Sequence, residues 1–121
     1  MTTLGIREEN LYGGSDDRWL GSREGLATAR TVTLDATAFP GAVDGVLKSG
    51  TQLAVGAGDK YAQFTDDTTQ TFAGFLVKDE NIGNGDAVSS LLDRGRIRTA
   101  FLPLPFVAST DAVASRFVFV S

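Results

Sequence analysis

Residues 51–64 read TQLAVGAGDKYAQF, and this pattern is the strongest structural signal in the chain. Leu53 and Val55 fall on one face of an extended backbone, as in a strand with one buried side. The following Gly56-Ala57-Gly58-Asp59 is typical of a tight turn, because glycine and aspartate tolerate a left-handed backbone. Residues 60–64 then return to an extended pattern. The stretch therefore predicts a β-hairpin.

Short β-type runs continue on both sides of this hairpin. Val32 and Leu34 share one face of residues 31–35, and residues 71–78 (TFAGFLVK) have the aromatic and branched side chains of a buried strand. Gly74 inside that run is typical of a bulge or of a close backbone approach. Further runs predict strands at residues 96–101 and 116–120, whereas residues 87–93 fit either a strand or one helical turn.

A short helix is expected near the end of the chain. Thr110 is placed to cap residues 111–115, and Asp111 would lie at the positive N-terminal end of that helix. Together, the runs predict a mainly β domain over residues 31–121 with one or two short helices.

Residues 1–30 differ from the rest of the chain. Charged side chains and glycines are scattered through them, and no period of 2 or 3.6 holds. Such a segment buries too little apolar area to offset the roughly 1–2 kcal/mol per residue that backbone ordering costs. We therefore predict a flexible N-terminal arm over residues 1–30. Trp19 in this polar stretch favours an anchor for a partner's pocket, and packing onto the chain's own domain is the alternative.

The composition narrows the chemistry. With 121 residues, 42% of them hydrophobic and 21% charged, we expect one globular domain. The absence of Cys and His removes thiolate nucleophiles, thiolate or imidazole metal sites and the usual general base near neutral pH. A net charge of −4 has the wrong sign for coating DNA or an anionic membrane. No signal or membrane-spanning segment is evident, so we expect synthesis in a cytoplasm. A binding or structural role is favoured over catalysis.

Two local clusters invite a ligand. The oxygen-rich loop at residues 79–86 (DENIGNGD) fails the spacing of an EF-hand, because Asn84 stands where glycine is required and Ser90 where glutamate is required. A solvated turn is favoured there over an irregular cation site. Arg96 and Arg98 share one face of a predicted strand. Since no aromatic residues are interleaved with them, an exposed sheet face or ion pairs with a neighbouring subunit are favoured over DNA binding.

Residues 101–107 (FLPLPFV) combine two prolines with four large apolar side chains. Because each proline lacks a backbone donor, the segment is expected to be an extended edge or a polyproline-like stretch. Each large side chain gains roughly 1.5–3 kcal/mol when it leaves water, so the segment is expected to be covered. The chain's own core and a contact between subunits both remain open as the cover.

An ordered set of motifs resembles the lambda-like bacteriophage head decoration proteins, also called capsid cement or stabilisation proteins. The set is GVLKSGTQLA at residues 45–54, Tyr61, FAGFL at 72–76, GRIR at 95–98, and Leu102-Pro103. Residues 31–35 and 111–120 are similar to the versions of this family in phages of actinobacteria, and the likeness spans residues 31–121. It implies a small β-tulip or β-clip-like domain without enzymatic activity, catalytic residues, cofactor or metal.

The resemblance further implies a homotrimer on the outer surface of the virion head, at three-fold and quasi-three-fold positions. Its arms would reach onto the major capsid protein, and neither nucleic acid nor membrane is expected as a partner. A chain that begins at Thr31 is then expected to stay folded and to lose adhesion to heads. We assign capsid contacts to Leu11, Tyr12, Arg18, Trp19 and Leu20, and the trimer interface to Phe101, Leu102, Pro103, Leu104 and Phe106.

Two other functions are weaker alternatives. A β-clip-type module would bind a small molecule or a glycan in a pocket formed by the hairpin at residues 50–64. A carboxylate-dependent hydrolase would need two acids at a defined separation in a pocket. The acidic pairs of this chain all fall in the predicted arm or in turns, at residues 16–17, 66–67 and 79–80.

Overall fold

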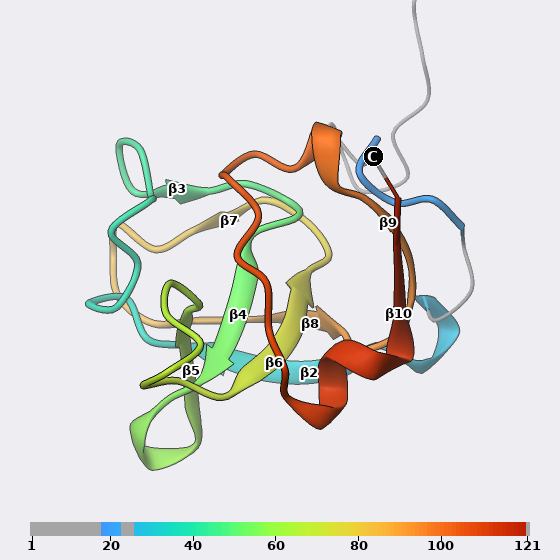
Figure 1. Cartoon of the computed structure of the whole chain (residues 1–121). Coiled ribbons are helices and arrows are strands. Elements are labelled where there is room, and N and C mark those ends of the chain that lie inside the picture. Colours follow the sequence, from blue (N-terminus) through green and yellow to red (C-terminus); the bar gives the residue numbers. More distant parts are fainter. Residues whose placement is uncertain (1–17, 23–25, 121) are drawn as a thin grey trace, which may run out of the picture.

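The computed structural model describes residues 18–22 and 26–120. Its centre is a closed five-stranded barrel in the order β2-β5-β4-β6-β8 (Figure 1). In chain order these strands are β2 (Arg30–Leu34), β4 (Gln52–Val55), β5 (Lys60–Gln63), β6 (Phe72–Leu76) and β8 (Ala87–Leu92). The prediction of a mainly β domain is confirmed.

Strand pairing follows the sequence patterns closely. β4 and β5 form the predicted antiparallel hairpin, and β6 and β8 extend the sheet antiparallel from β4. β2 runs antiparallel to β8 and closes the barrel through a short parallel pairing with β5. All five residues of β6 are buried, as the apolar run at residues 71–78 predicts. The ambiguous residues 87–93 are a strand, because β8 is held on both edges, by β2 and by β6.

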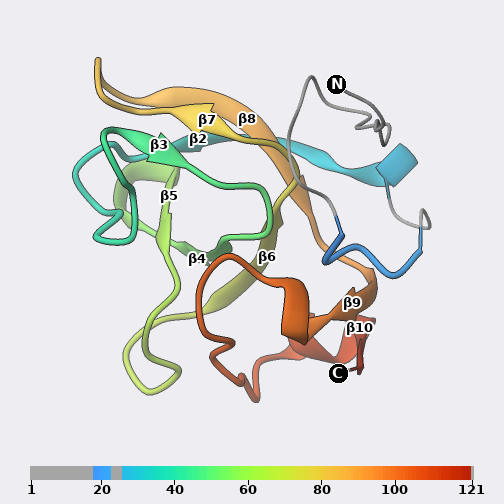
Figure 2. The same ribbon diagram turned by 90° about the horizontal axis from the view of Figure 1, so that it is seen from above.

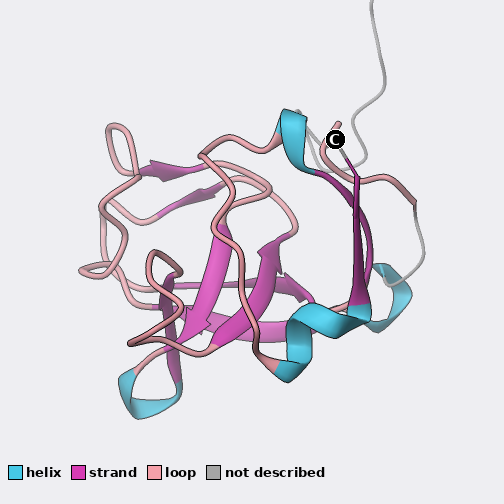
Figure 3. Ribbon diagram, in the orientation of Figure 1, coloured by secondary structure: helices cyan, strands magenta, loops and turns pink. Residues whose placement is uncertain are grey.

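Two small ribbons lie on different sides of the barrel (Figure 2). β9 (Gly95–Arg98) and β10 (Phe117–Val120) pair in parallel, and β3 (Val46–Leu47) pairs antiparallel with β7 (Glu80–Asn81). The helical segments of the described residues are short 3-10 helices, coloured cyan in Figure 3, and one of them covers most of the short helix expected at residues 111–115. They are η1 (Leu26–Thr28), η2 (Ala57–Asp59), η3 (Thr99–Phe101) and η4 (Ala112–Arg116).

The predicted cap of the last helix is wrong. Asp111, not Thr110, is the N-cap residue of η4, and no side chain caps the turn. The Asp111 carboxylate instead accepts a hydrogen bond from the backbone N–H of Phe72 at 2.8 Å, which ties η4 to β6. Thr110 donates its hydroxyl to Asp67 at 3.1 Å. Both polar groups therefore join separate segments rather than the turn beside them.

The core consists of two clusters that share β6. Phe72 and Phe75 point into an aromatic cluster with Trp19, Phe64 and Phe117. The other two side chains of β6, Ala73 and Leu76, point into an aliphatic cluster built from residues such as Leu34, Leu47, Leu53 and Leu91. Strict alternation would place Phe72 and Phe75 on opposite faces, and the register shift of β6 against β4 beside Gly74 lets both face the aromatic cluster.

Residues 18–22 belong to this domain, so the predicted boundary at residue 30 is wrong for them. Leu20 forms an antiparallel bridge with Ile97, and the backbone N–H of Arg98 donates to the Trp19 carbonyl at 2.7 Å. Leu26 and Ala29 also pack against the aromatic cluster. The remainder of the predicted arm, residues 1–17 and 23–25, lies outside the described residues.

Aspartates hold the exposed turns by accepting hydrogen bonds. A backbone N–H bond from Ala36 and the ammonium of Lys60 lower the pKa of Asp86, and the same ion pair, at 2.6 Å, raises the pKa of Lys60. The Thr37 hydroxyl lowers the pKa of Asp35, and the backbone N–H of Thr68 lowers that of Asp66. These carboxylates are thus stabilised in the charged form by the fold.

We expect stability to fall at both ends of the pH range. The stabilisation from a lowered aspartate pKa is fully present above the unfolded pKa and is lost as pH falls through the folded pKa. The stabilisation from the raised Lys60 pKa is lost as pH rises through that value. Asp86→Asn is therefore expected to flatten the melting temperature against pH at both ends. Thermal unfolding across the pH range checks this, and an unchanged profile would contradict it.

Candidate functional site

The N-terminal part of the described chain is rooted in the core by Trp19, of which 1% is exposed. Its ring stacks on Phe75 with a centroid distance of 5.6 Å. Its indole N–H donates to the Ser49 hydroxyl at 2.9 Å, and that hydroxyl donates to the Val77 carbonyl at 2.7 Å. A buried indole with its N–H satisfied is a strong anchor. The chain that precedes Arg18 is thus attached to the barrel through a fixed point.

The predicted capsid-contact residues differ in their positions and in their burial. Leu11 and Tyr12 lie outside the described residues, and Arg18 is exposed. The prediction that Trp19 anchors the chain in a partner's pocket is wrong. Its ring is buried in the chain's own aromatic cluster, and removing a ring of this size from water stabilises the domain. Leu20 is half-buried against the same cluster. Within this part of the chain, the alternative that Trp19 packs on its own domain is the one observed.

Residues 101–107 run across the barrel without entering a strand, as the two prolines predict. Leu102, Phe106 and Val107 pack against the aromatic cluster, and the Phe106 ring lies 4.8 Å from that of Phe119. Phe101 is 42% exposed. The chain's own core therefore covers part of the segment, and the exposed remainder comprises Phe101, Pro103 and Pro105, with Leu104 half-buried.

The buried Gln52 holds this segment in place. Its side-chain amide donates to the Val107 carbonyl at 2.8 Å and accepts from the Val107 N–H, also at 2.8 Å. These two bonds have the pattern of a β-bridge, and they connect β4 to the end of residues 101–107. Prolines cannot donate backbone hydrogen bonds to a neighbouring strand, and the Gln52 side chain supplies the connection instead.

Replacing Gln52 by Leu is expected to destabilise the domain by about 1–3 kcal/mol, because the half-buried backbone groups of Val107 lose their partner. Chemical denaturation measures the loss, and amide hydrogen exchange is expected to speed up at Val107. The matched variant Gln52→Glu keeps the acceptor for the Val107 N–H and is expected to protect that amide. Unchanged exchange at Val107 in the Leu variant would contradict the clamp.

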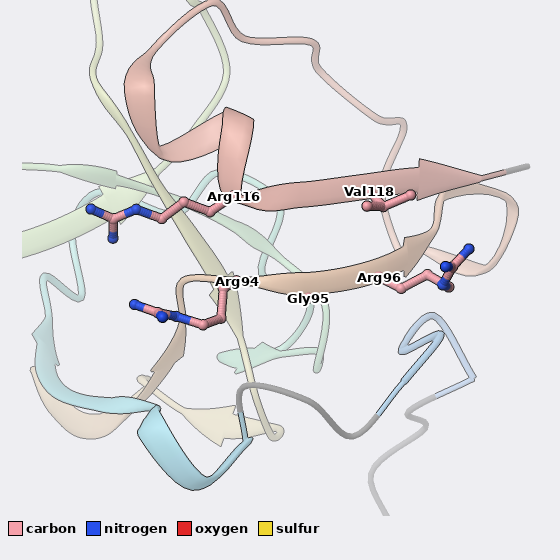
Figure 4. A pocket seen from close by; sticks show the side chains of 5 residues that line it. All are labelled: Arg94, Gly95, Arg96, Arg116 and Val118. Atoms are coloured by element: carbon pink, nitrogen blue, oxygen red, sulfur yellow. The ribbon is translucent and has the colours of Figure 1, made fainter.

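Arginines gather on the β9–β10 ribbon. A cavity of about 440 Å³ is lined by Arg94, Gly95, Arg96, Arg116 and Val118 (Figure 4). Figure 4 shows the Arg94 and Arg116 side chains extending to the same side, and Arg96 extending from the other end of β9. This cavity is open and polar, which suits a charged partner better than an apolar ligand.

Asp93 pairs with two of these arginines and with Arg30. It is 6% exposed, and its carboxylate lies 3.3 Å from Arg94, 3.6 Å from Arg116 and 3.7 Å from Arg30. These residues come from the start of β2, the β8–β9 turn and the end of η4. One buried carboxylate balances only one of three guanidinium groups, so the surface above it stays basic.

One residue of the predicted capsid contacts, Arg18, lies next to one residue of the predicted trimer interface, Phe101. The guanidinium of Arg18 lies 5.3 Å from the ring centroid of Phe101, and that of Arg98 lies 5.5 Å from it. Cations at these distances are attracted by the face of the ring. The entry point of the N-terminal segment, the exposed part of residues 101–107 and the basic ribbon thus form one continuous region.

The loop at residues 79–86 uses its oxygens on protein donors. Asp79 accepts from the backbone N–H of Ser49, Glu80 accepts from the Ser89 hydroxyl, and Asn81 accepts from the N–H of Gly83. Ile82 anchors the loop by burying its side chain. Within the described residues, no group of three Asp or Glu side chains is placed to share a metal ion.

Residues 18–22 and 26–120 contain no helix of the length and apolarity needed to cross a membrane. Comparison of the chain with protein-family models, with curated proteins and with solved structures gives no match.

Proposed function

We propose that this chain is a non-enzymatic decoration protein of a bacteriophage head. It binds as a homotrimer to the outer surface of the capsid, at three-fold and quasi-three-fold positions. There it contacts the major capsid protein and stabilises the expanded shell against the pressure of packaged DNA. The chain is made in the host cytoplasm and acts on the virion. Cohesion of a shell needs adhesion rather than chemistry, which fits a chain without Cys or His.

The observation that supports this proposal best is the root at Trp19. A tether transmits force only when its attachment point resists pulling. Here the indole is buried between Phe75 and Ser49, and the flanking backbone is hydrogen-bonded to β9. Load on the preceding residues would therefore act on the whole barrel. Three such tethers on one trimer would hold neighbouring capsomers through multivalency, so that no single contact must be strong.

The exposed Phe101 supports the subunit contact. Of the residues assigned to the trimer interface, Leu102 and Phe106 are also needed by the chain's own core, whereas Phe101 and Pro103 are exposed. The interface is therefore best probed with Phe101→Ser alone, because a change at Phe106 would also remove its contact with Phe119.

One observation favours the alternative of a ligand-binding module. A cavity of about 210 Å³ lies on the hairpin at residues 50–64, lined among others by Gln52, Phe64 and Leu104. That volume is below the roughly 300–1,000 Å³ typical of ligand sites, and the Gln52 amide is already paired with Val107. Decoration is therefore the better-supported function.

The test uses expanded, undecorated heads of the phage that encodes the chain. The full chain is expected to co-sediment with these heads, to saturate them in multiples of three copies and to raise the temperature at which they rupture. A chain lacking residues 1–17 retains Trp19, so it is expected to stay folded and to bind at least about tenfold more weakly. Circular dichroism checks its fold.

Two outcomes would count against the proposal. Full occupancy by the shortened chain, at the affinity of the full chain, would refute the role of the N-terminal segment. No binding of the full chain to expanded heads would refute the function itself. A chain that begins at Thr31, which is expected from the sequence to stay folded, is unsuitable for this test. It lacks Trp19, Leu20 and Leu26, which belong to the aromatic cluster or pack against it.

A further inference from the structure

The β9–β10 ribbon is covered on one face only. Ile97, Phe117 and Phe119 face the aromatic cluster, whereas Arg96 and its register partner Val118 face solvent. Residues 19–21 pair with the free edge of β9, but the outer face of β9 and β10 has no covering layer within the part of the chain that the structure describes. Parallel strands are normally covered on both faces. We call the outer surface of the ribbon the ribbon face, which consists of Arg94, Arg96, Arg98, Arg116 and Val118.

This face concentrates positive charge. The described residues include six arginines, and all six lie on the ribbon or next to it. Arg96 and Arg98 lie on β9, and Arg30, Arg94 and Arg116 contact Asp93. Arg18 flanks Phe101 together with Arg98. Like charges held close together repel one another, and Asp93 offsets only part of that cost. An acidic partner above the ribbon face would offset the rest. Val118, which is 52% exposed, would be covered at the same time.

A complementary surface lies around β5, on a different side of the barrel (Figures 1 and 2). Asp35 and Asp86 both interact with Lys60, and the exposed Asp59 precedes it. Val55 lines the same cavity as Asp59, and Val88 lies across β2 from Lys60, since both are register partners of Thr33. We call this surface the acidic end. It consists of Asp35, Asp59, Asp86, Val55 and Val88. The cations Lys60 and Arg30 also line its cavity, so three carboxylates face two cations and the surface keeps a negative excess.

We propose that the ribbon face of one copy docks on the acidic end of a second copy. The inference rests on the proposed function, because it names the surfaces that join the subunits of its homotrimer. Two different surfaces of one chain make a heterologous contact, which closes into a ring when the rotation between copies permits. Each contact brings opposite charges together around exposed apolar side chains: Val118 on one copy, and Val55 and Val88, which are 55% and 65% exposed, on the next.

A second copy fits the ribbon face better than a nucleic acid does. The chain carries a net charge of −4, so a polyanion and a second copy are both repelled at long range. The repulsion is weaker for a second copy, because duplex DNA carries one negative charge per about 1.7 Å of its length. The acidic end of a second copy still supplies carboxylates for the ribbon face. The apolar member of the ribbon face is Val118, and the one exposed aromatic ring beside it among the described residues, Phe101, is already flanked by Arg18 and Arg98.

The test measures the mass of the full chain by sedimentation. A particle near three times 12.8 kDa is expected at about 50 mM salt, and the dissociation constant is expected to rise at least about tenfold at about 1 M salt. Arg96→Glu with Arg98→Glu is expected to raise it about 100-fold. Neither residue pairs with Asp93, so the fold is expected to survive. The matched pair Arg96→Lys with Arg98→Lys is expected to stay within about threefold of the unaltered chain.

Charge exchange gives the decisive result. Asp59→Lys with Val88→Lys is also expected to weaken association, and all four substitutions in one chain are expected to restore it. A trimer that resists both salt and charge reversal would overturn this interface and leave the proposed function standing. A monomer under all conditions would overturn the interface and the homotrimer together. Assembly that requires an added oligonucleotide would assign the ribbon face to a polyanion and overturn the proposal.

Discussion

Trp19→Ala is expected to destabilise the domain by about 3–5 kcal/mol, which is comparable to the total stability of many small domains. The change removes a fully buried ring that stacks on Phe75, and it leaves the hydroxyl of Ser49 without its donor. The backbone pairing of residues 19–21 with β9 is expected to loosen with it. Urea denaturation monitored by circular dichroism measures the loss.

The matched variant Trp19→Phe separates packing from hydrogen bonding. It keeps an aromatic ring against Phe75 and loses the bond to Ser49, so a loss of about 1–3 kcal/mol is expected. If Trp19→Ala were as stable as the unaltered chain, residues 18–22 would not be part of the folded domain. The N-terminal segment would then lack the root on which the proposed function depends.

Gly74→Ala is expected to prevent folding or to cost more than about 4 kcal/mol. Gly74 lies in the middle of β6 with φ at +148°, a backbone conformation that side chains rarely adopt. A methyl group there would overlap the carbonyl oxygen of Leu92 on the neighbouring β8. Because backbone on both sides is fixed by the barrel, neither strand can yield without breaking the pairing of β6 with β8. Expression level and thermal unfolding measure the effect.

Gly58→Ala is the control for this variant. Gly58 also has a positive φ, of 62°, but nothing lies within 4 Å of the position that its Cβ would take. Its cost is therefore limited to backbone strain of about 1–2 kcal/mol. Equal losses for the two variants would contradict the close approach of β6 and β8.

The hairpin, the buried strand and the alternation of Arg96 and Arg98 could be predicted from the sequence, because each depends on neighbours two to five residues away. Periodicity in a window also identifies which side chains share a face. The paired prolines of residues 101–107 likewise exclude a central strand without reference to any partner. These features are local, and local backbone chemistry fixes them.

The sequence could not assign residues 87–93, whose strand depends on pairing with β2 and β6 on its two edges. The sequence predicts Trp19 in a flexible arm, because the partners of Trp19 cannot be recognised from its neighbours. These partners, Ser49 and Phe75, are 30 and 56 residues away along the chain. Nor could the sequence indicate the role of Gln52 as a substitute for a strand edge, since the partner at Val107 lies 55 residues along the chain. No local pattern records such partners.

The amino-acid sequence by itself determined a small β domain without thiol or imidazole chemistry, and it placed arginines on one face of a strand. The tertiary structure decided that this face gathers arginines from other elements around the buried Asp93, next to Phe101 and the root at Trp19. The physical reason is the closure of the barrel. It brings distant segments within a few ångströms of one another, where burial and charge then act between residues that the linear order keeps apart.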